Sequence, residues 1–253
     1  MQSIRIGAHT VKVYDGIEDL PILRYHKFNK CLLVDAGIGA DIAAVDRHLF
    51  KAHTYINANK ADLARLELEN MRQNINFIIN NITPKTLAFA ALVAEIDGQP
   101  QTDVTDAAIQ NVAKMLQDAT VKEIDTATEG EKKKIDAELK MMFADIFNDD
   151  ADKEYFDLLK ARTLMVLKGI ADGEDDTKRI EELTTQLMLH VKPKPFNGKD
   201  NAELRYDKNF EKLCIVLSEY TNANVKRLTV AEFYALLEYA KEKVAEQKKQ
   251  LKK

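Results

Sequence analysis

The feature of this sequence that most limits its fold is the scarcity of residues that interrupt helices. The chain of 253 residues contains only nine glycines and five prolines, and no tryptophan. Strand-rich folds need many glycine and proline turns, so these counts predict long helices joined by short connections. A chain of this length can bury one large core or two smaller ones. We therefore predict a mainly α fold, a multi-helix bundle with two lobes.

The first residues are the exception to this helical character. Residues 3–6 and 11–14 alternate apolar with polar side chains, and residues 7–10 lie between them. This pattern predicts a short N-terminal β-hairpin, and two strands alone are only marginally stable. Its apolar face is therefore either a lid on the local core or an interface with a neighbouring subunit, to which the hairpin would add a strand. The apolar residues of this face are Ile4, Ile6, Val11 and Val13.

Apolar residues at helical spacing, together with capping signals, place helices along the rest of the chain. Pro21 suits a first helical turn, and Gly37 would end that helix in a left-handed conformation. Thr83-Pro84 and two capping boxes, Thr128/Glu131 and Thr229/Glu232, predict three more helix starts. Further helices are predicted at about 41–55, 61–82, 105–116, 150–170, 174–190 and 209–221.

These elements divide the chain into four parts in sequence order. The hairpin occupies residues 1–16, a first helical lobe 17–120, a second helical segment 128–192, and a C-terminal helical pair 200–253. The stretch KPKPFNGKDN predicts a linker before the last part, because it contains two prolines and a glycine. LAFAALVAEI is apolar on nearly all sides and is predicted to be the central helix of the first lobe.

The motifs of most enzyme classes are missing. Residues 32–39 (LLVDAGIG) look like the start of a phosphate loop, but no further glycine follows at the dinucleotide spacing and no Gly-Lys-Ser/Thr exists. Asn148, Asp150 and Asp152 alternate as the first calcium ligands of a binding loop do, but the later glycine and glutamate are absent. A helix end and a solvated helix start explain these two stretches. We predict no enzyme activity, cofactor or metal, and the alternative is a nucleotide-binding enzyme centred on Asp35.

The two cysteines and the overall charge indicate the environment of the chain. Cys31 and Cys214 lie among apolar residues, which predicts buried free thiols and a reducing compartment. No run approaches the roughly 18 apolar residues of a membrane helix, and the start of the chain lacks the pattern of a signal peptide. The net charge of −4 gives no general attraction to nucleic acid or to an anionic membrane.

The end of the chain is locally basic. Between Lys241 and Lys253, six lysines stand against two glutamates. They either form a solvated helix end, where cations suit the helix dipole, or contact nucleic acid or an acidic partner. The residues of such a contact would be Lys248, Lys249, Lys252 and Lys253. Upstream lies an aromatic row that is either core or, if the last helix is detached, an interface, consisting of Phe233, Tyr234 and Tyr239.

Three stretches of the chain carry a resemblance to a known group of proteins. They are IEDLPILRYHKFNK near the start, ELENMRQNINFIINNITPKTLAFAALV in the middle and NFEKLCIVLSEYTNANVKRLTVAEFYALLEYAKEKV near the end, and cover roughly a third of the chain. They resemble proteins of tailed bacteriophages of gut Bacteroidetes, crAss-like phages among them. The resemblance implies a virion component or an assembly factor made in the cytoplasm of the infected bacterium, and it carries over no site residues.

We therefore expect a non-enzymatic structural protein of a phage particle, in a neck or tail ring or connector. It would act through helix packing with other phage structural or tail proteins and with copies of itself. The hairpin and the final helix are expected to reach neighbours, because a ring needs different surfaces on the two sides of each subunit. The alternative is a tail-assembly chaperone, absent from the finished particle, with an apolar groove for its client. The location is the virion or the cytoplasm of the infected bacterium.

Overall fold

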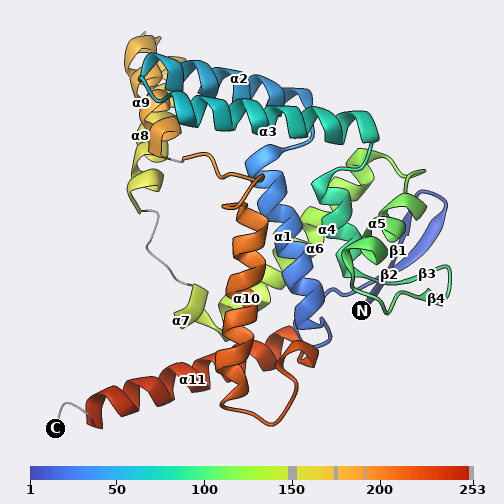
Figure 1. The fold of residues 1–253 in the computed structure, drawn as a ribbon. Coiled ribbons are helices and arrows are strands. Elements are labelled where there is room, and N and C mark those ends of the chain that lie inside the picture. Colours follow the sequence, from blue (N-terminus) through green and yellow to red (C-terminus); the bar gives the residue numbers. More distant parts are fainter. Residues whose placement is uncertain (148–152, 174–175, 191, 251–253) are drawn as a thin grey trace. The chain divides into compact units, whose positions relative to one another are not determined.

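The computed structural model describes residues 1–147, 153–173, 176–190 and 192–250 (Figure 1). The predicted mainly α fold with a short N-terminal β-hairpin is confirmed. The helices are α1 (Ile22–Ile38), α2 (Ile42–Asn57), α3 (Ala61–Asn80), α4 (Pro84–Leu92), α5 (Asp106–Met115), α6 (Val121–Met142), α7 (Ala144–Phe147), α8 (Lys153–Asp172), α9 (Thr177–His190), α10 (Ala202–Ser218), the 3-10 helix η1 (Val225–Arg227) and α11 (Val230–Gln250). The strands are β1 (Gln2–Ile6), β2 (His9–Val13), β3 (Val93–Ile96) and β4 (Gln99–Pro100).

The chain forms two compact units, each built from segments that are distant in sequence. Unit 1 contains Met1–Ala40, Asn76–Asn148 and Phe196–Lys253, and unit 2 contains Asp41–Ile75 and Asp149–Pro195. The predicted division followed the order of the chain. In the structure the hairpin, α1 and the C-terminal helices belong to the same unit.

The sheet of unit 1 is antiparallel, with the strand order β1-β2-β3-β4. β1 and β2 pair from Gln2 with Val13 to Ile6 with His9, so the turn is shorter than the predicted residues 7–10. The prediction of one helix through LAFAALVAEI is wrong at its end. α4 stops at Leu92, and the next four residues form β3, which pairs with β2.

The core of unit 1 combines residues of the sheet, α1, α4, α5, α6, α10 and α11. Phe28 of α1 and Phe89 of α4 are among its largest fully buried side chains. Burying one such side chain stabilises a fold by about 1.5–3 kcal/mol relative to leaving it exposed. α1 and α4, which supply these two residues, pack against each other, and α4 also packs against α5 and α6.

Arg24 is buried in unit 1 although it is charged. Its Nη1 donates to the carbonyls of Ala91 at 3.0 Å and Val93 at 2.8 Å, and its Nη2 donates to the carbonyl of Gln101. The guanidinium also lies over the ring of Tyr14, 5.5 Å from its centroid. Burial lowers the pKa of Arg24. These bonds hold the junction of α4 and β3 to α1.

The C-terminus of α1 differs from the prediction. The helix continues to Ile38, and Gly39 rather than Gly37 is its C-cap, with a positive φ of +71°. Gly37 lies inside the helix, where an added Cβ would come within 2.4 Å of the Phe196 ring. The glycine is therefore needed for close packing. Residues 32–34 are helical, so the strand that would precede a phosphate loop is not formed.

The start of α6 is a second correction. The helix begins at Val121, where Glu123 N donates to Thr120 Oγ1 at 3.2 Å and Thr120 N donates to Glu123 Oε2 at 2.8 Å. The predicted start at Thr128/Glu131 is wrong, because both residues are buried within α6. The predicted starts at Thr83-Pro84 and Thr229/Glu232 are confirmed.

Unit 2 contains α2, most of α3, α8 and α9. The apolar stripes expected from helical spacing are only partly buried: Tyr55 is buried, but Ile42 and Leu49 are exposed. The α2–α3 contact instead buries His48 and Glu67, with His48 Nδ1 2.6 Å from Glu67 Oε2. α8 packs against α9.

Candidate functional site

The hairpin residues predicted as an interface lie mostly inside unit 1. Ile6, Val11 and Val13 are buried in its core, and Ile4 packs half-buried against it. They are core residues here, and the hairpin covers the local core, which was one of the two predicted alternatives. Strand addition to a neighbouring subunit stays a prediction and would use the outer edge of β1, whose one neighbour in the described sheet is β2.

The aromatic row of α11 divides between the core and the surface. Phe233 is buried and stacks on Phe210, with ring centroids 6.0 Å apart. Tyr234 packs edge-on against Tyr25 at 6.4 Å, and burial raises the pKa of Tyr234. Tyr239 is exposed. Of the three predicted residues, Tyr239 is therefore the one available to a partner.

The C-terminal half of α11 is almost entirely exposed and extends away from the other helices of unit 1 (Figure 1). From Lys241 to Gln250 it carries four lysines and two glutamates. Of the lysines predicted as a contact, Lys248 lines the groove described next and Lys249 is exposed. Lys252 and Lys253 lie outside the described residues.

An apolar groove of about 300 Å³ lies between α10 and α11. Each helix supplies residues at spacings of three and four, so one stripe of each helix faces the groove. Two lysines are the charged residues of this lining. The lining consists of Leu213, Val216, Leu217 and Tyr220 from α10 and the turn after it, and of Leu237, Ala240, Lys241, Val244, Ala245 and Lys248 from α11.

The face that α10 presents is fixed by its packing on the core of unit 1. Cys214 is buried in that core, which leaves Ile215 and Val216 exposed. An ion pair of 2.7 Å between Lys226 and Glu211 joins η1 to α10, in the connection that leads to α11. The exposed valine is therefore held at the wall of the groove by the fold of unit 1.

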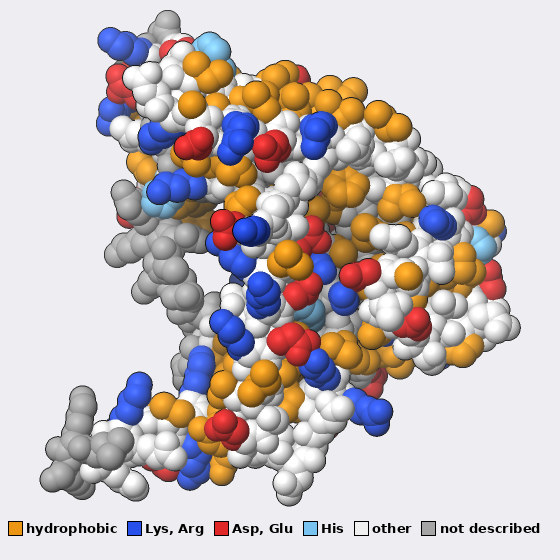
Figure 2. All heavy atoms as spheres, in the orientation of Figure 1, with side chains coloured by type: hydrophobic (Ala, Val, Ile, Leu, Met, Phe, Trp, Pro, Cys, Tyr) orange, Lys and Arg blue, Asp and Glu red, His pale blue; other side chains and the backbone are white. Residues whose placement is uncertain are grey.

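The groove combines an apolar floor with a positive rim. Lys241 and Lys248 are seven residues apart on α11 and lie on the same side of the helix. Figure 2 shows hydrophobic side chains beside Lys and Arg side chains over α10 and α11. An amphipathic helix that carries acidic residues beside its apolar stripe has the matching surface.

A second pocket, of about 290 Å³, is lined by α1, α10 and α11 and is mainly aromatic. The ring of His26 lies parallel to the rings of Tyr206 and Phe210, with centroids 4.7 Å and 4.1 Å away. Its Nε2 is 2.8 Å from Asp207 Oδ1. Burial lowers the pKa of His26, so the imidazole is neutral near pH 7. His26 therefore joins α1 to α10, and the pocket offers apolar contact.

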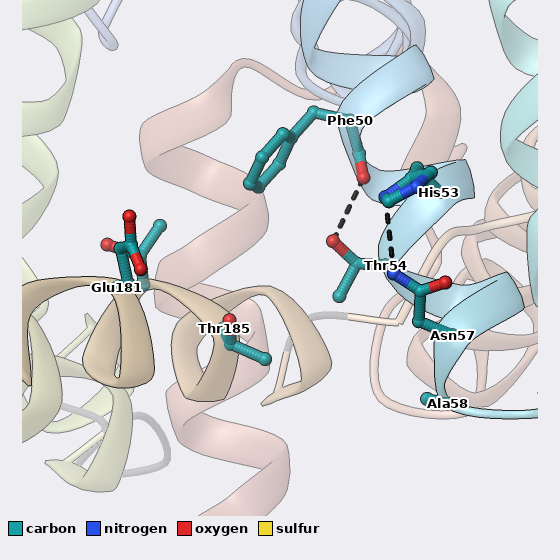
Figure 3. A pocket seen from close by; sticks show the side chains of 8 residues that line it. Phe50, His53, Thr54, Asn57, Ala58, Glu181 and Thr185 are labelled. Atoms are coloured by element: carbon teal, nitrogen blue, oxygen red, sulfur yellow. Dashed lines mark hydrogen bonds between the residues drawn. The ribbon is translucent and has the colours of Figure 1, made fainter. Parts of the chain in front are cut away.

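A pocket of about 530 Å³ in unit 2 is lined by α2 and α9 (Figure 3). Thr54 Oγ1 donates to the carbonyl of Phe50 at 2.9 Å, and Asn57 Nδ2 lies 3.3 Å from His53 Nδ1. Both contacts lie within α2, and Glu181 on α9 belongs to neither. The polar side chains labelled in Figure 3 do not converge on a common point.

The remaining candidates for chemistry are few. No group of three or more His, Cys, Asp or Glu side chains in the described part of the chain could hold a metal ion. The calcium-like pattern at Asn148, Asp150 and Asp152 lies outside the described residues.

Both cysteines are free, and burial raises the pKa of Cys31 to about 12, so this thiol stays protonated near neutral pH. Among the described helices, none has the length and apolar character to cross a membrane.

Comparisons with protein-family models, with curated proteins and with solved structures found no match for this chain.

The final helix was predicted from the sequence, but the wall that α10 contributes to the groove was not. The available signal was the spacing of Leu213, Val216, Leu217 and Tyr220, which is that of one helical stripe. Helical spacing alone does not show whether such a stripe is covered. The stripe of α10 begins in the core at Leu213 and Leu217 and continues into the groove.

Proposed function

We propose that this chain is a non-enzymatic structural protein of a phage virion, a neck or tail ring or connector component that assembles through helix-mediated contacts. The observation that supports this most is the apolar groove between α10 and α11. Eight of the ten residues that line the groove lie within residues 209–244, the longest stretch that resembles phage proteins. The protein would be made in the cytoplasm of the infected bacterium and carried in the virion.

The proposed occupant of the groove is an amphipathic helix of another virion protein, with acidic residues beside its apolar stripe. Val216 and Val244 are exposed in the groove, and covering apolar surface contributes about 25 cal/mol per Å². Lys241 and Lys248 supply the charge that acidic flanking residues would meet. Such charges set orientation and rate of association more than affinity.

A photo-crosslinking residue in place of Val244 tests this proposal in infected cells. In purified particles, this variant is expected to cross-link to a second virion protein, because Val244 lines the groove. The matched control places the same residue at Glu242, which is exposed on α11 but does not line the groove. The control is expected to cross-link far less.

Three results would contradict the proposal. If peptides of this chain are absent from purified particles, it is not a virion component. A Val244 cross-link to a tail protein in infected cells, with no peptides in particles, would instead favour the tail-assembly chaperone. Equal cross-linking from Val244 and Glu242 in particles would remove the groove as the contact surface.

A further inference from the structure

α2 carries a seven-residue apolar repeat that unit 2 only half covers. Ile42, Leu49 and Ile56 occupy the first position of the repeat, and Val45 and Ala52 the fourth. The first positions are 73%, 48% and 57% exposed, whereas Ala52 is buried and Val45 is half-buried. Apolar residues at the first and fourth positions form the seam along which helices associate in coiled coils and bundles.

α3 carries the same repeat in unit 2. Leu68 and Ile75 occupy first positions and are 41% and 37% exposed. Ala64 and Met71 occupy fourth positions and are buried and half-buried. Up to Ile75, both helices therefore turn their fourth positions inward and leave their apolar first positions open, whereas Ile78, the next fourth position of α3, is 38% exposed.

The two seams lie side by side on one face of the α2–α3 hairpin. His48 and Glu67 hold the seventh positions of the two repeats, and the 2.6 Å contact between His48 Nδ1 and Glu67 Oε2 brings these positions together. Each of them directly precedes an exposed first position, Leu49 or Leu68. Figure 2 shows hydrophobic side chains gathered along α2 and α3. This apolar hairpin face consists of Ile42, Leu49, Ile56, Leu68 and Ile75.

We propose that the apolar hairpin face is the contact between two copies of this chain, whose α2–α3 hairpins form an antiparallel four-helix bundle. A face with two parallel seams is filled by two further helices, and a second copy supplies a hairpin with the same repeat. The face is about 24 Å long and about 20 Å wide, from the rise and diameter of helices. Two such faces bury roughly 1,000 Å², the lower limit of a specific interface.

The flanking charges favour a second copy as the occupant. At the fifth position of the repeat, α2 has Asp46, and α3 has Arg65 and Arg72, all three exposed. A two-fold axis parallel to the helices places α2 of one copy on α3 of the other. Such a rotation leaves the height of each residue along the helix axis unchanged. Since His48 is level with Glu67, Asp46 then lies within four residues, about 6 Å along the axis, of each arginine of the second copy. Opposite charges at these positions specify helix partners.

The solution mass of the full chain tests this inference, by light scattering over a range of concentrations. The wild-type chain is expected to associate through an even number of copies, with a dimer as the smallest species. Leu49→Glu is expected to weaken dimerisation at least about tenfold, since a buried charge at an interface centre costs more than one factor of ten in affinity. Its circular dichroism should be unchanged, because Leu49 is exposed in the single chain. Ile215→Glu, also at an exposed apolar position but on α10, should leave the dimer intact.

Charge reversal tests whether Asp46 of one copy pairs with Arg65 and Arg72 of the other. Asp46→Arg should weaken the dimer, and combination with Arg65→Asp and Arg72→Asp should restore it. A wild-type chain that stays monomeric at all concentrations would overturn the inference, and so would a dimer that Leu49→Glu leaves unchanged. These outcomes concern mass alone, so they are independent of cross-linking through the groove in particles.

Discussion

The core of unit 1 and the α2–α3 contact of unit 2 differ in the side chains that they bury. Unit 1 buries aliphatic and aromatic residues from the sheet and several helices, Phe28 and Phe89 among them. Its buried cation, Arg24, donates to three backbone carbonyls. Since a buried polar group is tolerated when its hydrogen bonds are made, the core of unit 1 is complete within one chain.

The α2–α3 contact is arranged in the opposite way. Glu67 is 1% exposed and Asn70 is equally buried, while Leu49 and Ile75 stand outside. Asn70 Oδ1 forms no hydrogen bond with the described residues, and Glu67 Oε1 forms none either, its ion-pair partner Lys51 Nζ lying 3.9 Å away. Buried oxygens that lack hydrogen bonds oppose folding, and uncovered apolar side chains contribute little to it. The core of unit 1 is therefore stable within one chain, whereas the α2–α3 hairpin gains stability when its apolar face is covered.

The largest predicted effect is a cavity in the core of unit 1. Phe89→Ala should lower the free energy of unfolding by about 3–5 kcal/mol, because Phe89 is fully buried. Urea unfolding followed by circular dichroism measures the change. The matched control is Leu204→Ala on α10, an exposed position where a change within about 0.5 kcal/mol is expected. A loss below about 1 kcal/mol at Phe89 would mean that unit 1 is not the better packed region.

The second prediction concerns the close packing of Gly37 on Phe196 in unit 1. Gly37→Ala should destabilise the chain by about 1–3 kcal/mol, because the added methyl group meets the buried ring. In a Phe196→Leu background the same change should be neutral or stabilising by up to about 1 kcal/mol, since alanine is the better helix former. Thermal or urea unfolding of the four variants gives the coupling. If the two changes were simply additive, the role of Gly37 would be conformational instead.

The C-terminal end of α1 shows how far the fold could be predicted from the sequence. Gly37 and Gly39 are both plausible ends of α1, and the choice depends on Phe196, which lies far along the chain. The same holds for α6, where Thr120/Glu123 and Thr128/Glu131 carry the same capping pattern and burial of Thr128 decides between them. Helix starts with no competing capping pattern nearby, such as Thr83-Pro84, were predicted correctly.

Long-range pairing set the other limit of prediction. β3 follows α4 without a turn residue, and it is a strand because β2 lies beside it. The candidate site was predictable in part: Tyr239 and the lysines of α11 are exposed, but the groove exists because α10 lies next to them. Composition and periodicity contain no information on which distant helices meet.

The third prediction tests the polar contact of α2 and α3. Replacing both His48 and Glu67 by leucine should leave the free energy of unfolding within about 1 kcal/mol or raise it, because well-packed apolar pairs often equal buried polar pairs. Glu67→Leu alone removes the acceptor next to His48 Nδ1 and should destabilise by about 1–3 kcal/mol. Urea unfolding of the single and double variants measures both. If the double variant lost more free energy of unfolding than the two single variants together, the prediction would be contradicted and the His48–Glu67 pair would have a structural role.

The smallest predicted effect is a pH dependence in unit 1, from His26. Burial lowers the pKa of His26 below its usual value near 6.5, so on acidification the unfolded chain takes up the proton first. Its contribution to stability is therefore complete at pH 7.5 and falls as the pH decreases through 6.5. Urea unfolding at pH 7.5 and 5.5 should show a smaller loss for His26→Asn than for the wild type.

The comparison of the two pH slopes is needed because other groups titrate nearby. The hydrogen bond to Asp97 raises the pKa of His9, so His9 gives stability that is present at low pH and lost as the pH rises. Burial alone would raise the pKa of Asp207, but hydrogen bonds from Lys30 and His26 outweigh it and lower this pKa, which places its effect below pH 4. The difference between wild type and His26→Asn isolates the imidazole within unit 1. If wild type and His26→Asn lost the same free energy of unfolding between pH 7.5 and 5.5, protonation of His26 would carry no penalty. The core of unit 1 would then tolerate a charged side chain as readily as the α2–α3 contact tolerates Glu67.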